Sequence, residues 1–288
     1  MRDAADFLVI GDAVLDVAVA PEDESRPGGD VPAAVGAAPG GQGANIAVRL
    51  ARRGVPVRLA CAIGEDVAGR IVRHALSAEG VLLEAAGTGG SGVVVILVAA
   101  DGERTMFSRR IPLLPLSFDT TAAWTIVSGY VLLEDGELRL NDRGGRIAVV
   151  GCSLPDGAAS DWWLRAASLR PDLVIMNADE ARAVGDDAAK LALHAAAIVV
   201  VTGPDGVNAA YPNPELAVRR VGIDRVAAAD TTGAGDAFAA ALVAELREPP
   251  WPPSPATLDR ALAAAAGFAV EVTQVPGAQT RVPGESNA

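Results

Sequence analysis

Residues 229–238 read Ala-Asp-Thr-Thr-Gly-Ala-Gly-Asp-Ala-Phe, and an apolar, alanine-rich stretch follows them directly. The pattern predicts a long helix that begins with three small residues, Gly233, Ala234 and Gly235. The free N–H groups and the positive dipole end of a helix N-terminus form an anion site, and glycine lets the backbone approach an oxyanion closely. We expect Asp236, in the first turn, to face the bound anion, and we expect the helix dipole to keep its carboxylate ionised and weakly basic.

A helix cap is the simpler explanation of the same residues. Asp230 or Thr232 can cap a helix N-terminus, and Asp236 can complement its dipole. Capping requires a single acidic residue, however, and two aspartates flank this glycine turn. The pair of aspartates therefore favours a functional site.

Short apolar runs alternate with helical stretches along the rest of the chain. The expected strands cover residues 7–10, 57–63, 124–127, 147–150, 173–176 and 198–201, and the expected helices include 44–53, 67–78, 234–246 and 257–272. This alternation predicts an α/β fold in which a mostly parallel central sheet carries helices on both faces. Ligands bind such sheets at the carboxyl ends of the strands.

Two hairpin-like segments do not fit the alternation. We expect them to form a small β-sheet that covers the ligand cleft as a lid, with strands from about 12–35 and 91–110. Asp101-Gly102 is a strong turn signal within the second segment. Residues 21–39 are rich in Pro, Gly and acids and are expected to be loop and edge structure. The whole chain, 1–288, is predicted to be a single domain.

The composition excludes several classes of protein. The 288 residues include 24 Lys+Arg and 36 Asp+Glu, which gives a formal net charge of -12, and 50% of them are hydrophobic. Such a chain can bury a large core and is not expected to be disordered. The acidic balance argues against a nucleic-acid binder, which needs a basic footprint. A phosphorylated ligand must therefore be held by a local site.

Export and membrane insertion are not indicated. The N-terminus carries two acidic residues, unlike a signal peptide, and apolar runs such as 92–100 are too short to span a bilayer. Cys61 and Cys152 lie in apolar, strand-like stretches and are interpreted as buried thiols of a reducing cytoplasm. Two cysteines and two histidines provide no zinc set. We expect a cytoplasmic protein without a nucleic-acid or membrane partner.

A second glycine-rich cluster, Pro-Gly-Gly-Gln-Gly-Ala-Asn at residues 39–45, stands directly before a helix. A dinucleotide-binding turn is one explanation, but Ile46 occupies its third glycine position. A tight turn and a ligand site explain the glycines equally well. Gln42 and Asn45 add groups that can hydrogen-bond a hydroxylated ligand.

A third cluster, Asn177-Ala178-Asp179-Glu180, follows the expected strand 173–176. The carboxyl end of a strand is where a ligand contact belongs. Taken alone, however, the four residues are typical of an ordinary helix start with an acidic first turn, and this explanation is favoured.

Together the three clusters resemble the ribokinase, or PfkB-type, family of carbohydrate kinases. The matching motifs follow the family's order at residues 40–47, 50–54, 63–69, 101–105, 128–130, 177–180, 202–206 and 230–236. The last motif is specific in this context, and the others gain their weight from their joint order. The resemblance implies a ribokinase-like fold and ATP-dependent phosphoryl transfer to a primary hydroxyl of a sugar or sugar derivative.

The resemblance also implies roles for individual residues. Asp236 would accept the hydroxyl proton, and the anion hole would consist of Gly233, Ala234 and Gly235. The implied acceptor-binding residues are Asp16, Gly40, Gly41, Gln42 and Asn45. The implied nucleotide-binding residues are Asn177, Glu180, Thr202, Gly203, Gly206 and Thr231. Glu180 would hold Mg²⁺ through water, and Asp230 and Thr232 are candidates for binding a monovalent cation, K⁺.

The chain departs from the family at three places. Gln42 stands where ribokinases proper usually carry Lys, so ribose is not implied as the substrate. Arg109-Arg110-Ile111-Pro112 replaces the Arg-Gly-Ala-Asn that often follows the lid hairpin. Arg281 stands where many relatives have a serine beside bound K⁺, and we expect its guanidinium to replace that cation.

Two alternative functions stay open, a nucleoside kinase of the adenosine or pseudouridine type and a non-catalytic sugar-binding relative. The intact motif at 233–236 argues against the second. Residues 93–98 are hydrophobic on both faces of an expected lid strand. A strand buried on one side only would leave an apolar patch, which predicts a homodimer through the lids.

Overall fold

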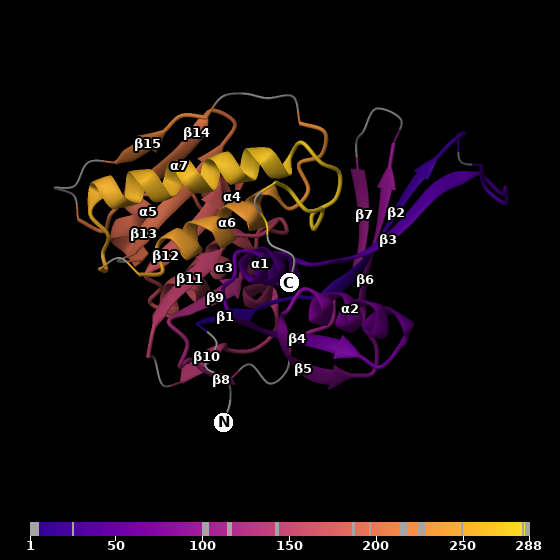
Figure 1. The fold of residues 1–288 in the computed structure, drawn as a ribbon, viewed down its shortest axis with the longest axis horizontal. Coiled ribbons are helices and arrows are strands. Elements are labelled where there is room, and N and C mark those ends of the chain that lie inside the picture. Colours follow the sequence, from indigo (N-terminus) through magenta and orange to yellow (C-terminus); the bar gives the residue numbers. More distant parts are fainter. Residues whose placement is uncertain are drawn as a thin grey trace.

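The computed structural model describes residues 6–24, 26–99, 104–113, 117–141, 144–185, 188–195, 197–213, 218–223, 228–248, 250–283 and 285. Its main element is a nine-stranded sheet with the spatial order β15 (Arg219–Val221), β14 (Gly206–Ala210), β13 (Ile198–Gly203), β12 (Leu173–Asn177), β11 (Arg146–Val150), β9 (Trp124–Ser128), β1 (Phe7–Ile10), β4 (Val57–Gly64) and β5 (Leu82–Thr88). All neighbours from β13 to β5 are parallel, whereas β14 runs antiparallel to β13 and β15. The predicted mostly parallel sheet is confirmed (Figure 1).

Helices cover both faces of this sheet, because alternate residues of its buried strands point to opposite sides. In β1, Phe7 and Val9 belong to one core, and Leu8 and Ile10 belong to the other. The helices of the first core are α1 (Gln42–Arg52), α2 (Val67–Ala78), α6 (Ala234–Glu245) and α7 (Pro255–Val272). The helices of the second core are α3 (Ala159–Ser168), α4 (Ala178–Val184) and α5 (Ala188–Ala195). None of the described helices is long and apolar enough to cross a membrane.

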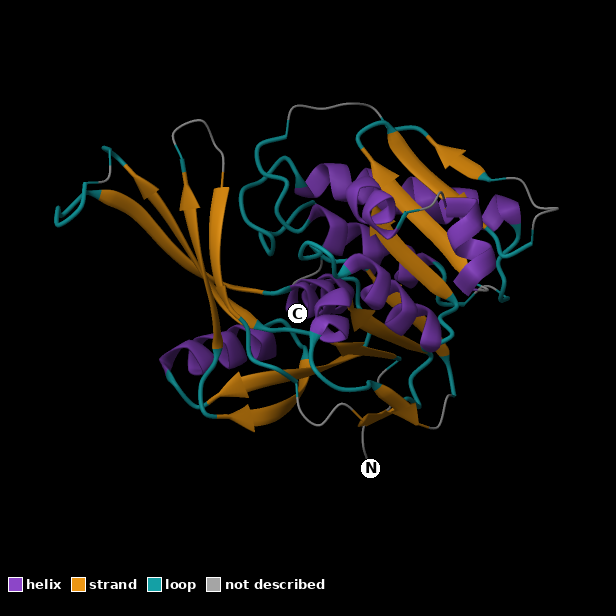
Figure 2. Cartoon of the chain, turned by 180° about the vertical axis from the view of Figure 1, so that it is seen from behind, coloured by secondary structure: helices purple, strands orange, loops and turns teal. Residues whose placement is uncertain are grey.

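A second, four-stranded sheet, called the small sheet below, projects beside the large one (Figures 1 and 2). Its spatial order is β3 (Ala33–Gly40), β2 (Val14–Pro21), β6 (Gly92–Val98) and β7 (Arg104–Arg109). The central pair is parallel and the two outer pairs are antiparallel. The two hairpin-like segments therefore form one sheet, as expected, and the turn at 101–102 lies outside the described residues.

Strand β3 refines the expectation of loop and edge structure for residues 21–39. Pro21 ends β2, the described residues 22–24 and 26–32 are loop and turn, and from Ala33 the chain forms an edge strand whose eight residues all pair with β2. The strand consists mostly of Ala, Gly and Pro, so its pairing partner and not its own propensity determines its conformation. The same reason explains why the pattern misses β5, β14 and β15. A short parallel pair, β8 (Ser117–Asp119) with β10 (Arg139–Asn141), and a 3-10 helix, η1 (Gly129–Leu133), complete the described elements.

Buried charges attach the C-terminal segment to α1. The fully buried Arg49 pairs with Glu285 at 2.8 Å and donates to the carbonyl of Ala278 at 2.7 Å. Arg52 donates to the carbonyl of Gln279 at 2.8 Å. These bonds bring the side chain of Gln279 to the first turn of α1.

Candidate active site

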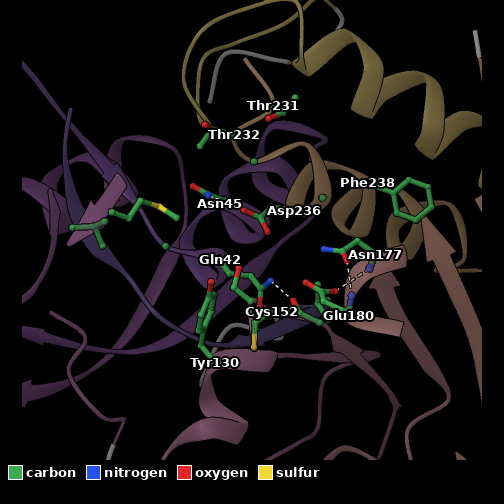
Figure 3. A pocket seen from close by; sticks show the side chains of 18 of the residues that line it. Gln42, Asn45, Tyr130, Cys152, Asn177, Glu180, Thr231, Thr232, Asp236 and Phe238 are labelled. Carbon is green, nitrogen blue, oxygen red and sulfur yellow. Dashed lines mark hydrogen bonds between the residues drawn. The ribbon is translucent and has the colours of Figure 1, made fainter. Parts of the chain in front are cut away.

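A cavity of about 370 Å³ lies at the carboxyl ends of the central strands and beneath the small sheet. The small sheet contributes Val14, Asp16, Val94, Ile96 and Met106. The ends of β11, β12 and β13 contribute Val150, Asn177 and Thr202, and α1 and α6 contribute their first turns (Figure 3). Residues of all three sequence clusters therefore meet in one cavity, at the sheet edge where a ligand was expected.

Asp236 lies in the first turn of α6 and points toward Asn45 (Figure 3). The Nδ2 of Asn45 donates to Oδ2 of Asp236 at 2.8 Å, and Nε2 of Gln279 donates to Oδ1 of Asn45 at 2.9 Å. Burial raises the pKa of Asp236 to about 7, and the charge of Asp12 adds to the rise while the Asn45 hydrogen bond opposes it. The expectation that the helix dipole leaves Asp236 weakly basic is therefore wrong, since burial outweighs the dipole. A carboxylate with this pKa can accept a proton near neutral pH.

The N-terminus of α6 has the conformation of an anion site. Gly233 adopts a φ of 75°, and a Cβ there would lie 2.8 Å from the Cβ of Ala278, so glycine is required. Within the described residues no side chain caps α6. The carboxylate of Asp230 instead accepts the N–H groups of Thr232, at 2.7 Å, and Gly277, at 2.8 Å. The capping explanation therefore fails. Gly233 and Gly235 line the cavity, whereas the predicted third member of the anion hole, Ala234, does not, and its N–H donates to the carbonyl of Thr231 at 3.3 Å.

Gln42 is the first residue of α1 and lines the cavity, but most of its amide is engaged by protein groups. Its Nε2 donates to the carbonyl of Gly151 at 2.7 Å, and its Oε1 accepts from the hydroxyl of Ser128, at 2.7 Å, and from the N–H of Gly129, at 3.0 Å. The side chain thus joins the ends of β9 and β11. Gly41, the preceding residue, has a φ of 98°. A Cβ on Gly41 would lie 2.8 Å from the carbonyl oxygen of Asp12. The tight-turn explanation of the glycines is thus correct, and Gly41 also lines the cavity.

Asp16 projects from β2 into the cavity, between its register partners Ala38 and Val94. Burial raises the pKa of Asp16 to about 6, with Asp12 acting in the same direction and Arg110 against it. Gly40 does not line the cavity itself. A Cβ at Gly40 would lie 2.0 Å from Oδ2 of Asp16, so this glycine makes room for the carboxylate.

The sequence analysis missed Asp12 and the role of Arg110. Asp12 forms an ion pair with Arg110, whose guanidinium carbon lies 3.7 Å from the centroid of the Tyr130 ring. Arg110 and Tyr130 both line the cavity. The departure from Arg-Gly-Ala-Asn at 109–112 was the signal for Arg110. An acidic residue two positions after the strand at 7–10 could have pointed to Asp12.

Asn177 and Glu180 begin α4 and line the cavity as well. The two residues form a reciprocal capping box, in which Oδ1 of Asn177 accepts from the N–H of Glu180 at 2.8 Å and Oε2 of Glu180 accepts from the N–H of Asn177 at 2.9 Å. The helix-start explanation is therefore correct, and the ligand-facing position holds beside it. Burial raises the pKa of Glu180. One carboxylate with a cap-bound oxygen fits a hydrated Mg²⁺, which keeps several of its waters, better than a directly ligated ion.

The remaining predicted nucleotide positions divide into two groups. Thr202 and Thr231 line the cavity. Gly203 and Gly206 do not, but pair across the turn of the β13–β14 hairpin. Gly206 has a φ of 130°, and a Cβ there would lie 2.2 Å from the carbonyl oxygen of Val221. These glycines therefore shape the hairpin next to the cavity.

Cys61 and Cys152 are both buried free thiols, as expected. Cys152 follows β11 and does not lie within a strand, and it lines the cavity. Burial raises the pKa of the Cys152 thiol to about 12, so it stays protonated.

The guanidinium expected at Arg281 is supplied by a different residue. Arg281 pairs with Glu79 at 2.8 Å, so the expectation that it replaces a cation beside the anion hole is wrong. Arg104, from the small sheet, lies 2.9 Å from Oδ1 of Asp230 and donates to the hydroxyl of Thr232.

The family model for pfkB family carbohydrate kinases matches residues 4–123 and 152–284. The chain belongs to this family. It is therefore a phosphotransferase with an alcohol group as acceptor, of the carbohydrate or nucleoside kinase class, as the sequence motifs indicated. The pfkB assignment rests on a match across most of the chain and agrees with the position of Asp236 at the start of α6.

Individual proteins resemble the chain in sequence or in fold. A fructokinase of Klebsiella pneumoniae is 31% identical in an alignment of 314 residues, gaps included, that covers 96% of this chain and 95% of that protein. A ribokinase of Thermotoga maritima superposes with a TM-score of 0.78 at 20% identity, covering 97% of this chain and 96% of the other. An aminoimidazole riboside kinase of Salmonella enterica, solved with aminoimidazole riboside and an ATP analogue, gives a TM-score of 0.76 at 23% identity and 96% coverage of both chains. The ribokinase-like fold is thus confirmed.

Proposed function

We propose that the protein transfers the γ-phosphoryl group of ATP to a primary hydroxyl of a monosaccharide, with a ketohexose as the first candidate. The observation that carries this proposal is the carboxyl of Asp236, whose pKa is raised to about 7 at the open N-terminus of a helix. A base and an anion site at one point are what phosphoryl transfer to a hydroxyl requires.

The chemistry follows from this geometry. The acceptor hydroxyl, held near Asp16 and Asn45, gives its proton to Asp236 while its oxygen forms a bond to the γ-phosphorus. The bond between the γ-phosphorus and the bridging oxygen breaks, and its electron pair leaves with ADP. The N–H groups at Gly233 and Gly235 stabilise the charge on the phosphoryl oxygens during the transfer. Mg²⁺ held through water at Glu180 would neutralise part of the phosphate charge.

The acceptor end of the cavity favours a sugar over a nucleoside. The guanidinium of Arg110 covers one face of the Tyr130 ring, so that face does not serve as a platform for a nucleobase. Asp16 and Arg110 provide hydrogen-bonding groups for hydroxyls. Similarity to a fructokinase supports a ketohexose. A nucleoside remains the second candidate, because an aminoimidazole riboside kinase has a similar fold.

We propose further that residues 1–288 act as one catalytic unit in which the small sheet is the lid, and that two copies associate through it. Side chains of both sheets line the same cavity, which supports a single unit. On the other face of the small sheet, Val17, Val95 and Phe107 are register partners. Phe107 is 60% exposed and Val35, on the same face, is 66% exposed. An apolar sheet face of this kind fits a second copy of itself.

A coupled ADP-release screen across sugars, sugar acids, sugar phosphates and nucleosides tests the activity. The highest kcat/KM is expected for a ketohexose. A nucleoside with the highest value would favour the second candidate. Binding of a sugar without ADP release would support a non-catalytic relative. Light scattering tests the assembly, and a monomer at high micromolar concentration would reject the dimer.

A further inference from the structure

Arg104 begins β7, near the tip of the small sheet, and reaches across to the large sheet's side of the cavity. Side chains alternate along a strand, so Arg104 lies on the same face as Met106, which lines the cavity. Its guanidinium nevertheless contacts residues more than a hundred positions later, Asp230 at 2.9 Å and the hydroxyl of Thr232. Within the described residues, Asp230 and Thr232 are the polar partners of Arg104.

The loop that Arg104 contacts is the one that leads into the anion hole. The carboxylate of Asp230 accepts N–H groups from Thr232 and Gly277, at 2.7 and 2.8 Å, and Thr232 immediately precedes Gly233. Arg104 donates to the same carboxylate. The side chain of Asp230 is 10% exposed, so this ion pair is partly desolvated and stronger than a surface pair.

The contact starts from the face of the small sheet that lines the cavity. Met106 and Ile96 are register partners on this inner face, and both line the cavity together with Asp16 and Gly233. An acceptor that fills this space touches the small sheet from below. Arg104 is the residue through which that sheet holds the loop of Asp230 and Thr232.

We propose that Arg104 is a positioning residue that couples the lid to the anion hole, so that acceptor binding under the small sheet and the geometry for phosphoryl transfer depend on one another. This inference rests on the proposed function. Because the contact joins the small sheet to the loop before Gly233, its loss should also admit water as a competing acceptor. Arg104 touches no substrate in this scheme and acts through Asp230.

The test compares Arg104→Gln with Arg26→Gln. Both changes remove one positive charge from the small sheet, but Arg26 lies in the exposed connection between β2 and β3. Arg104→Gln should lower kcat with the acceptor by about 10- to 100-fold, the effect of a misplaced reacting group, and should leave the KM for ATP unchanged. The rate of ATP hydrolysis, measured without acceptor, should rise relative to the rate of acceptor phosphorylation. Arg26→Gln should change neither quantity.

A double-mutant cycle with Asp230→Asn tests the route of the effect. If Arg104 acts through Asp230, the double variant is no slower than the slower single variant. Additive losses would overturn the proposal, because Arg104 would then act independently. A lower melting temperature with unchanged kcat would overturn it as well, since the ion pair would then be merely structural.

Amide hydrogen exchange in the free protein separates this proposal from the proposed function. Arg104→Gln should accelerate exchange at β7 and at the N–H groups of Thr232 and Gly277, whereas Arg26→Gln should not. Faster exchange in a chain that phosphorylates no acceptor would uphold the coupling and reject the proposed function. Unchanged exchange would reject the coupling whatever the activity.

Discussion

Asn45 and Asp236 are 191 residues apart in the chain, and a 2.8 Å hydrogen bond joins the amide of the first to the carboxylate of the second. The bond connects the first turn of α1 with the first turn of α6. Gln279, held by the C-terminal segment, in turn fixes the amide of Asn45. The base of the proposed reaction is therefore positioned by three distant parts of the sequence.

Asp236→Asn should abolish turnover while both substrates still bind. Asparagine keeps the shape of the side chain but cannot accept the hydroxyl proton, so kcat should fall by about 10²- to 10⁴-fold with little change in KM. Removing a buried carboxylate should leave the melting temperature unchanged or raised. Turnover and melting temperature are measured on the same variant, and near-native turnover would exclude Asp236 as the base.

The pH profile of kcat/KM should show the titration of two buried carboxyl groups, Asp236 and Asp16. Because the pKa of Asp236 is raised to about 7 and that of Asp16 to about 6, kcat/KM should fall below pH 7 and more steeply below pH 6. Asp16→Asn should retain only the upper inflection. A raised carboxyl pKa favours folding at low pH, so the contribution of Asp236 to stability is complete below its ordinary value of 3.8 and is lost as the pH rises through about 7. A flat profile between pH 5 and 8 would contradict both assignments.

Gln279→Leu should slow the enzyme although Gln279 does not line the cavity. Without the Nε2 donor, the amide of Asn45 is free to turn and present its oxygen to Asp236, which repels the carboxylate and raises its pKa further. We expect a lower kcat and an upper inflection at higher pH. Arg281→Gln, two residues later and paired with Glu79, is the matched control and should leave both unchanged. An unaltered pH profile in Gln279→Leu would argue that Asn45 needs no orienting partner.

Arg110→Ala should weaken acceptor binding specifically. The change removes the counter-charge of Asp12 and the cation above Tyr130, so the acceptor KM should rise about tenfold, the value of one charge-assisted hydrogen bond. The KM for ATP should not change. Because the Tyr130 ring becomes uncovered, nucleosides should gain relative to sugars. Equal losses for sugars and nucleosides would show that the ring face plays no part in selectivity.

Potassium should affect this enzyme only weakly. Both oxygens of Asp230 already accept protein donors, and Arg104 places a positive charge beside them. Turnover is measured with sodium replaced by potassium at constant ionic strength, and kcat should change little. Activation by many-fold would show that a cation site exists beside this loop despite the ion pair.

The order of strands and helices could be predicted because β1, β4 and β12 are buried on both faces. Their sequences are therefore continuous apolar runs that stand out between the helical stretches. The position of Asn177 at the carboxyl end of β12 likewise made it a candidate for the cavity, although a helix start was the favoured explanation. Strand β3 could not be predicted, since its Ala and Gly residues become a strand only by pairing with β2. The raised pKa of Asp236 and the partner of Arg104 depend on burial and on contacts across the whole chain, which local patterns do not contain.

Gly151 has a consequence for anyone who wishes to redesign this enzyme. Its carbonyl receives the amide of Gln42 on the acceptor side, while a Cβ there would lie 2.2 Å from Oε2 of Glu180 on the nucleotide side. A mutant library aimed at new acceptors can vary Tyr130, which lines the cavity and does not belong to the small sheet. Any replacement at Gly151 would push Glu180 aside, so this position must be left out of the randomised set.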